Sequence, residues 1–417
     1  MKNSKFLSSV TTLTSGSVIA QLLTLLCAPI LTRLFTPAEM GSYTYLISFV
    51  AIFMGVINGK YDMAVVIERE ERNVYALIKL SLIIGAVFTI LGTLIFVAYN
   101  VITSKSLYVD DVLFVVLVLV SYALINVLTA YNNRQREYKV MATVNIIRTG
   151  CQNIGAVLLG LVHLGKTGLI IPYVIGQYLG VNKQGKTLKE HWHEIRGISK
   201  AELKHVLIKH KSQPMFSAPA ALANSFSYSS ITIFLNTLFG EALVGFYSIS
   251  VRLLGLPLAL ISGNVSKVFF ESAAKEHADT GQFYAAFRKV FLFQLMLAIP
   301  IVIVMYYLGP PICAFVFGKE WRVAGEYIQI LAPMFGIRFI VTSLSPSFII
   351  SNKQSYDFLL QLLFVISSLI CFLVSRYHKL PVEAYLTIIS VLFSIVYLVY
   401  LTIIYYYSKR KKCDDNV

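Results

Sequence analysis

Long apolar runs recur from one end of the chain to the other, separated by short polar stretches. A run of about twenty apolar residues is long enough to cross a hydrocarbon core of about 30 Å as a helix. The runs lack the apolar–polar alternation of membrane-spanning barrel strands. The pattern therefore predicts an all-α polytopic membrane protein. The twelve predicted spans lie at residues 10–32, 43–61, 79–100, 112–131, 142–163, 167–181, 214–238, 243–266, 287–307, 326–350, 357–376 and 383–407.

One apolar stretch occurs twice. Residues 31–66 read LTRLFTPAEMGSYTYLISFVAIFMGVINGKYDMAVV, and residues 235–270 read LNTLFGEALVGFYSISVRLLGLPLALISGNVSKVFF. The two align without a gap, and Gly41 and Tyr43 fall on Gly245 and Tyr247. Repeats of this size in an apolar chain are typical of transporters, and chance similarity between two Leu- and Phe-rich segments is the alternative.

The repeat divides the chain into domains. Six predicted spans separate the two copies, and because that number is even, both copies face the same way across the membrane. We therefore predict two parallel-related six-helix lobes around a central cavity. The predicted domains are an N-terminal lobe at 1–181, a basic cytoplasmic linker at 182–213, a C-terminal lobe at 214–408 and a cytoplasmic tail at 409–417. The Lys- and His-rich linker is typical of a segment that lies on anionic lipid headgroups.

Charge gives the orientation. The chain has 417 residues, of which only 14% are charged, and a net charge of +15. With the N-terminus inside, 26 of the 36 Lys and Arg residues lie on the cytoplasmic side and seven on the other. This asymmetry predicts that both termini are cytoplasmic. It also assigns the basic charge to topology, so no nucleic-acid partner is expected.

The sequence carries no sign of an enzyme. It lacks the GxSxG, HExxH, P-loop and Rossmann glycine patterns. Its five cysteines show no metal-like spacing, so we expect small core residues and no metal site. With no nucleotide site, transport would draw on a gradient of an ion, the substrate or the product.

Three arginines remain inside the predicted spans: Arg148, Arg252 and Arg338. All 21 acidic residues lie outside the spans or at their edges. A charge in the membrane is costly unless it faces water or a partner, and the guanidinium fork matches phosphate geometry. We therefore expect these arginines to bind an acidic, phosphorylated substrate. A purely structural role is the alternative, and a carrier of cationic drugs would instead need buried carboxylates.

Further polar residues accompany these arginines. Asn145 and Gln152 lie three and four residues from Arg148, on the same helix face. Asn58, Lys60 and Asp62 end the second span. We expect Asn58, Lys60, Asn145 and Gln152 to contribute to substrate binding and Asp62 to be the ion-linked carboxylate. Polar contacts between helices are the competing interpretation for each of them.

Four sequence blocks carry a family resemblance. These are TRLFTPAEMGSY with KYDMAVV near the start, NRQREYK after the fourth span, GEALVGFYSISVRLLGLPLALISGNVSKVFF, and FGKEWRVAGEYIQILAPMFGIRFIVTSLSPSF. In their order and spacing the chain resembles bacterial Wzx-type polysaccharide flippases, the polysaccharide-transport branch of the MOP exporter superfamily. The resemblance covers essentially the whole chain.

The resemblance implies a function. Flippases of this kind move an undecaprenyl-diphosphate-linked oligosaccharide from the cytoplasmic to the periplasmic leaflet of the bacterial inner membrane, for O-antigen, capsule or related glycans. It implies a MATE-like fold, a basic cavity that Arg148, Arg252 and Arg338 would line, and no cofactor, and it leaves proton or sodium coupling open. Membrane lipids and the glycan polymerase and chain-length proteins are the further partners implied. A MATE-like ion-coupled antiporter of drugs or metabolites is the alternative, and a membrane polymerase or scaffold is a third.

Overall fold

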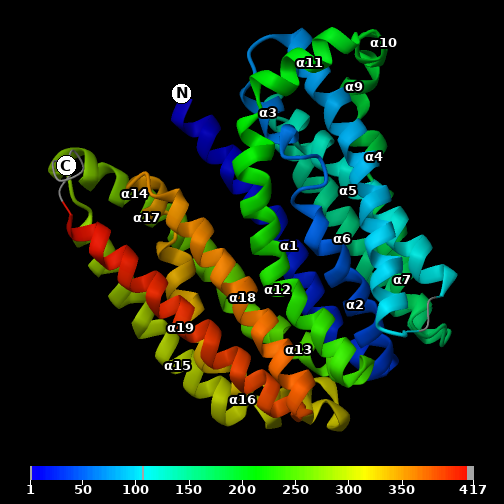
Figure 1. The fold of residues 1–417 in the computed structure, drawn as a ribbon, viewed down its shortest axis with the longest axis vertical. Coiled ribbons are helices and arrows are strands. Elements are labelled where there is room, and N and C mark those ends of the chain that lie inside the picture. The colour runs from blue at the N-terminus through cyan, green and yellow to red at the C-terminus, as the bar shows by residue number, and fades with distance from the viewer. Residues whose placement is uncertain (1, 106–107, 411–417) are drawn as a thin grey trace. The chain divides into compact units, whose positions relative to one another are not determined.

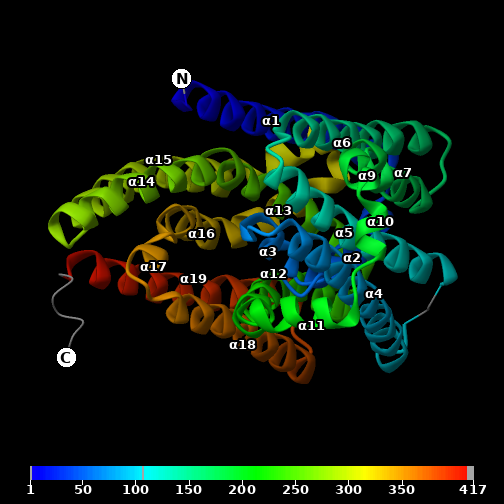
Figure 2. The same cartoon turned by 90° about the horizontal axis from the view of Figure 1, so that it is seen from above.

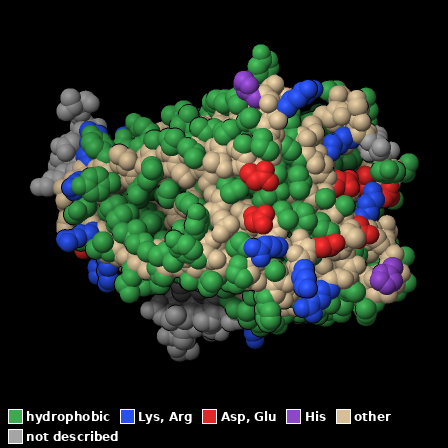
Figure 3. Space-filling model, turned by 90° about the horizontal axis from the view of Figure 1, so that it is seen from below, with side chains coloured by type: hydrophobic (Ala, Val, Ile, Leu, Met, Phe, Trp, Pro, Cys, Tyr) green, Lys and Arg blue, Asp and Glu red, His purple; other side chains and the backbone are tan. Residues whose placement is uncertain are grey.

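The computed structural model describes the backbone of residues 2–105 and 108–410, and the side chains of residues 16–105, 108–215 and 217–410. Within these ranges every regular element is a helix, and no strand occurs (Figure 1). Eight helical segments there are long and apolar enough to cross a membrane. Hydrophobic side chains cover most of the face shown in Figure 3, with charged side chains scattered among them. The predicted all-α polytopic membrane fold is confirmed.

Twelve helices in the described part of the chain occupy the twelve predicted spans. They are α1 (Lys2–Leu34), α2 (Pro37–Met54), α4 (Glu71–Ile102), α5 (Val109–Arg134), α6 (Tyr138–Leu161), α7 (Thr167–Tyr178), α12 (Ala218–Phe239), α13 (Glu241–Pro257), α15 (Tyr284–Phe317), α16 (Arg322–Leu344), α18 (Gln354–His378) and α19 (Val382–Lys409). Shorter helices connect them: α3 (Tyr61–Ile67), α8 (Val181–Gln184), α9 (Lys186–Glu190), α10 (Trp192–Arg196), α11 (Lys200–Lys209), α14 (Gly263–Thr280) and α17 (Ser347–Ile350). Single turns lie at η1 (Gln213–Ser217), η2 (Leu258–Ser262) and η3 (Lys319–Trp321).

Packing divides the chain into two compact units, residues 1–233 and 234–417, so that the division falls inside α12. The sequence placed the boundary earlier, in the linker at 182–213, and the assignment of the two lobes stays a prediction. In unit 1, α1 packs on α6, α6 on α7, and α4 on α5. In unit 2, α16 lies against α13, α15 and α19.

Each copy of the repeat begins a helix, α2 in the first copy and α13 in the second. Thr36 caps the N-terminus of α2 through a capping box with Glu39: the Glu39 amide donates to the Thr36 hydroxyl, and the Thr36 amide donates to the Glu39 carboxylate. Pro37 takes the first helical position, where its missing N–H costs nothing. In the second copy Gly240, with φ of +90°, precedes α13. The two sequences therefore start the same helix by different local chemistry.

The two copies differ at their far ends. In the first copy the helix stops at Met54, passes through Gly59 and Lys60 with φ of +60° and +63°, and restarts as α3. In the second copy the turn η2 carries the chain from α13 directly into α14. Lys60 thus holds a left-handed backbone that favours glycine, whereas its counterpart Asn264 lies within a helix. The predicted span at residues 43–61 is therefore interrupted by a turn after Met54.

The linker segment, which we define as residues 181–211, folds onto unit 1. Helices α8 to α11 lie across one end of α3, α4 and α5, as the view from above shows (Figure 2). Leu188, Ile195 and Val206 of this segment belong to one buried cluster with side chains of α3, α4 and α5. The Lys79 ammonium donates to the carbonyls of Arg196 and Ile198 at 2.9 and 2.8 Å. One side of the segment therefore packs on protein, and the contact of its basic side chains with lipid headgroups stays a prediction.

A buried carboxylate fixes the end of this segment. Glu68, with a side chain only 4% exposed, accepts contacts from Lys209 and His210, both at 2.8 Å. Burial raises the pKa of Glu68, but the bonds from Lys209, from His210 and from the amides of Glu70 and Arg69 outweigh it and hold the pKa at about 2. Glu202 of α11 accepts from Arg72 at 2.6 Å, and this hydrogen bond lowers its pKa to about 2 as well. The side chains of Arg72 and Glu202 are 46% and 31% exposed, so solvent screens this pair more than it screens Glu68.

Glu68→Gln is expected to lower the thermal unfolding midpoint at pH 7. Because the folded-state pKa of Glu68 lies below its usual value of about 4.3, its stabilisation is present above about pH 5 and is lost as the pH falls toward 2. The loss is at most about 3 kcal/mol, and solvent around Lys209 reduces it.

The unfolding midpoints of the wild type and the variant at pH 7 and pH 4 test this. The wild type should lose more stability between the two pH values than Glu68→Gln does. Glu202→Gln is the matched control and should change little, because its ion pair is exposed. Equal acid sensitivity of the wild type and Glu68→Gln would contradict the assignment.

Candidate functional site

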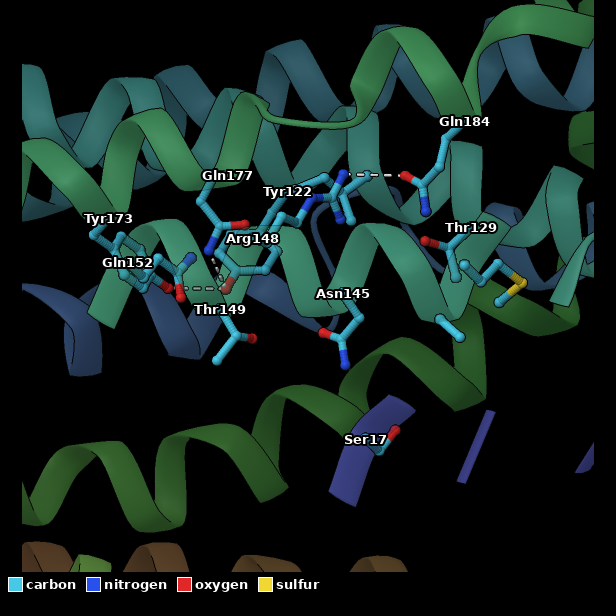
Figure 4. A pocket seen from close by; sticks show the side chains of 13 residues that line it. Ser17, Tyr122, Thr129, Asn145, Arg148, Thr149, Gln152, Tyr173, Gln177 and Gln184 are labelled. Atoms are coloured by element: carbon cyan, nitrogen blue, oxygen red, sulfur yellow. Dashed lines mark hydrogen bonds between the residues drawn. The ribbon is translucent and has the colours of Figure 1, made fainter. Parts of the chain in front are cut away.

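A cavity of about 430 Å³ lies within unit 1, among α1, α5, α6, α7 and α8 (Figure 4). None of its lining side chains in the described part of the chain is acidic. Its polar lining is Ser17, Tyr122, Thr129, Asn145, Arg148, Thr149, Gln152, Tyr173, Gln177 and Gln184. A space of this size suits a small polar group. The predicted cavity between the two lobes is a different one and stays a prediction.

Helix α6 supplies the main wall of the cavity. Arg148 and Thr149 lie three and four residues after Asn145, and Gln152 lies four and three residues after them, so the four residues form one stripe along the helix. The sequence analysis named three of these four, and the structure brings those three together in one cavity. The neighbouring helix comes close here: a Cβ at Gly176 would lie 2.7 Å from Cγ of Gln152 and 3.0 Å from the carbonyl oxygen of Arg148.

Arg148 carries the positive charge of the cavity. Its Nε donates to the carbonyl of Leu179 at 3.1 Å, and its Nη2 donates to Oε1 of Gln184 at 3.0 Å. Both acceptors are neutral. Figure 4 shows the side chain reaching along the cavity toward Gln184. A guanidinium held by neutral acceptors, with no acid among the described lining residues, is suited to receive an anion.

The other end of the cavity is a group of hydroxyls and amides. The hydroxyls of Tyr122 and Tyr173 lie 2.9 Å apart, and Gln177 Nε2 donates to the Tyr122 hydroxyl at 3.2 Å. The ring of Tyr43 meets that of Tyr173 edge to face, with centroids 5.8 Å apart. Such groups both donate and accept hydrogen bonds, as sugar hydroxyls require.

Asn58 lies outside this cavity. Its side chain is 1% exposed, and its Nδ2 donates to the carbonyls of Ser81 and Ala123, both at 3.0 Å. Because both amide hydrogens are occupied, Asn58 joins α4 to α5 at the interruption after α2. Lys60 and Asp62 follow at the start of α3, also away from the cavity lining.

The other two arginines belong to unit 2. Arg252 on α13 and Arg338 on α16 are both partly buried. The guanidinium of Arg338 lies 5.3 Å from the ring centre of Phe335, within the range of a cation–π contact. The predicted set of three arginines is thus divided between the two units.

Sequence reasoning did not find several of the cavity residues. Tyr122 and Thr129 lie seven residues apart on α5, and Tyr173 and Gln177 lie four apart on α7, so each pair shares a helix face. That spacing was a usable signal. Gln184 gave none, because it reaches the cavity only through the turn between α7 and α8.

Among the residues described by the structure, no group of three His, Cys, Asp or Glu side chains could hold a metal ion. The described cysteines, Cys27, Cys151, Cys313 and Cys371, are free thiols, and Cys413 lies outside the described residues.

Residues 30–326 match the family described as polysaccharide biosynthesis protein. No curated protein sequence matches the chain. Solved structures share its fold. An inward-facing multidrug resistance MATE family transporter of the MOP superfamily is 12% identical, covers 92% of this chain and 93% of its own, and has a TM-score of 0.71. The lipid II flippase MurJ, in an inward closed conformation, is 14% identical, with 94% and 86% covered and a TM-score of 0.70.

A third solved structure shares the fold. It is a MOP superfamily transporter from Pyrococcus furiosus, described as having a binding pocket of reverse polarity, which suggests a different function. It is 12% identical, covers 95% of this chain and 93% of its own, and has a TM-score of 0.58. At these identities the three structures establish the fold, that of multi-pass MOP superfamily transporters.

Proposed function

The chain belongs to the polysaccharide biosynthesis protein family, and we propose that it is a flippase for a lipid-linked oligosaccharide. The proposed substrate is a glycan repeat unit on undecaprenyl diphosphate. It moves from the cytoplasmic to the periplasmic leaflet of the bacterial inner membrane by alternating access. In this proposal both termini, and the end of unit 1 that the linker segment covers, are cytoplasmic.

The observation that carries the proposal is the Arg148 guanidinium, which lies in a cavity with no acidic side chain among its described lining residues. Among the described residues, Arg148 donates hydrogen bonds to the neutral acceptors of Leu179 and Gln184. A diphosphate offers acceptor oxygens with full charge, and a guanidinium binds such a group more strongly than it binds an amide or a carbonyl. The neutral polar side chains beyond Arg148 would then face the sugars.

The proposal gives each polar element a role. Arg148 binds the diphosphate, and Asn145 and Gln152, on the same stripe of α6, hydrogen-bond the first sugar. In unit 2, Arg252 and Arg338 bind acidic groups of the substrate in other steps of the cycle, and Lys60 guides the anionic head from the membrane surface. Asp62 carries the coupling ion, a proton or sodium. Asn58 has no role in binding, because helix packing uses its amide hydrogens.

An ion-coupled antiporter of drugs or metabolites is the second candidate, since a MATE multidrug transporter shares the fold. The sign of the cavity charge separates the two. A cationic drug would be repelled by Arg148, and the described lining residues include no carboxylate to bind it.

Complementation tests the proposal. The gene is expressed in a panel of bacterial strains, each lacking the flippase of one defined surface glycan, and the glycan is visualised on gels. Restored glycan in at least one strain is the expected result. Drug resistance on expression, without restored glycan in any strain and with normal membrane insertion, would favour the antiporter instead.

A further inference from the structure

The C-terminal end of α7 is joined to the linker segment by a sharp turn. Leu179 ends α7 with extended backbone, and Gly180 follows with φ of +82° before α8 begins. A Cβ at Gly180 would lie 2.5 Å from Cγ1 of Val144 on α6. The turn therefore needs glycine, for both its backbone and its close approach to α6. It sets the linker segment directly against the helix that carries Arg148.

Arg148 bridges this turn. Its Nε binds the carbonyl of Leu179 before the turn, and its Nη2 binds the side chain of Gln184 after it. Gln184 is itself 3% exposed, and its carbonyl accepts from Nδ2 of Asn132 on α5 at 2.8 Å. One buried glutamine therefore joins the cavity cation to α8, the first helix of the segment that leads out of unit 1.

The rest of the linker segment is packed against the same unit, with α10 and α11 on α4. Arg72 reaches the segment at two points, the Gly197 carbonyl at 3.3 Å and the Glu202 carboxylate at 2.6 Å. A change at α8 therefore acts on a folded segment. The chain then continues into α12, within which unit 1 ends.

We propose that Gln184 is a positioning residue that holds the Arg148 guanidinium until the substrate anion displaces it. This inference rests on the proposed function, because it takes the diphosphate as the ligand of Arg148. Binding of the anion exchanges a neutral amide for a charged acceptor, which is the stronger partner. Gln184 then loses its hydrogen bond to Arg148 and keeps the one from Asn132, so α8 becomes less stable. Occupancy of the cavity is in this way communicated to the linker segment.

Two substitutions at Gln184 should shift binding in opposite directions. Gln184→Ala removes the competitor of the anion, so the affinity for the anion should rise about three- to tenfold. Gln184→Glu places a carboxylate on the guanidinium, so the affinity should fall about tenfold or more. Loss of a structural contact alone would move both variants the same way. Asn182→Asp is the matched control: Asn182 is exposed on the same short helix, and its Oδ1 accepts from Lys189.

The experiment uses the full chain in lipid nanodiscs, with undecaprenyl diphosphate as the probe and the phosphate-free undecaprenol as the reference lipid. Affinities are measured for the wild type and the three variants. In the wild type, hydrogen exchange of residues 181–190 is followed with and without the probe. We expect undecaprenyl diphosphate to speed hydrogen exchange of residues 181–190, and we expect undecaprenol to leave it unchanged.

The outcomes separate the two proposals. No preference of the wild type for the diphosphate lipid would overturn the proposed function and this inference together. Preferential binding with unchanged exchange in residues 181–190, or with Gln184→Ala and Gln184→Glu shifted in the same direction, would overturn the role of Gln184 and leave the flippase proposal standing. The exchange measurement needs no variant, so misfolding of a substituted protein cannot hide the result.

Discussion

Arg148→Ala is expected to abolish surface glycan in a complemented flippase-deletion strain and to weaken the binding of undecaprenyl diphosphate by about 2–5 kcal/mol, roughly 30-fold or more. The guanidinium is the one charged group among the described residues that line the cavity. Alanine leaves the diphosphate with amides and hydroxyls only, and these neutral donors bind phosphate more weakly than a guanidinium does.

Two further variants define the role of the side chain. Arg148→Lys keeps the charge but loses the fork, so intermediate binding is expected. Arg33→Ala removes an exposed arginine of α1 and should leave both glycan and binding at wild-type levels. Because Arg148 also holds Leu179 and Gln184, each variant is first checked for normal membrane insertion and a monodisperse elution profile. Wild-type glycan in a correctly inserted Arg148→Ala protein would remove Arg148 from the site.

The sequence was informative about the fold because the bilayer imposes helix length and polarity directly. Each of the twelve predicted spans overlaps one of the twelve helices named above. The interruption after Met54 was not foreseen, since nothing in the apolar pattern distinguishes a span that continues from one that turns through Gly59 and Lys60. The two copies of the repeat differ at this point, because the second copy continues through η2 into α14.

The site was predictable only where one helix carries it. Asn145, Arg148 and Gln152 lie on one face of α6, and helical spacing alone groups them. Gln184 and Tyr122 come from other elements, and their meeting with Arg148 depends on tertiary packing. Residue type alone does not identify a cavity residue. Asn58 and Asn145 have the same side chain, but Asn58 is buried in helix packing and Asn145 is exposed to the cavity.

A charged residue inside a predicted span is a stronger sequence signal than a neutral polar residue. A membrane makes a charge without water or a partner expensive, so a buried arginine is informative by itself. A buried asparagine or glutamine can be satisfied by two backbone carbonyls, and the sequence does not show where those carbonyls are. The neutral lining residues Tyr122, Tyr173, Gln177 and Gln184 are therefore identified only by the structure.

Gly325→Ala is expected to prevent stable folding of unit 2. Gly325 lies on α16 where it meets α15, and a Cβ there would sit 2.3 Å from Cα and 2.5 Å from N of Pro310. These are backbone atoms, so no side chain can turn aside to make room, and the two helices would have to separate. Small residues at such crossings allow helices in membranes to pack closely. Overpacking of this kind should destabilise unit 2 by about 3 kcal/mol or more.

Gly255→Ala is the matched control, because the same change is made in the same unit without the collision. Gly255 lies within α13, and a Cβ there has no described atom within 4 Å. Alanine favours a helix over glycine by about 0.5–1 kcal/mol, so this variant should be as stable as the wild type or slightly more so. Thermal unfolding midpoints and elution profiles of the two detergent-solubilised variants decide the matter. A Gly325→Ala protein with the wild-type midpoint would mean that α15 and α16 do not pack backbone to backbone, and the close crossing of α15 and α16 in unit 2 would then be incorrect.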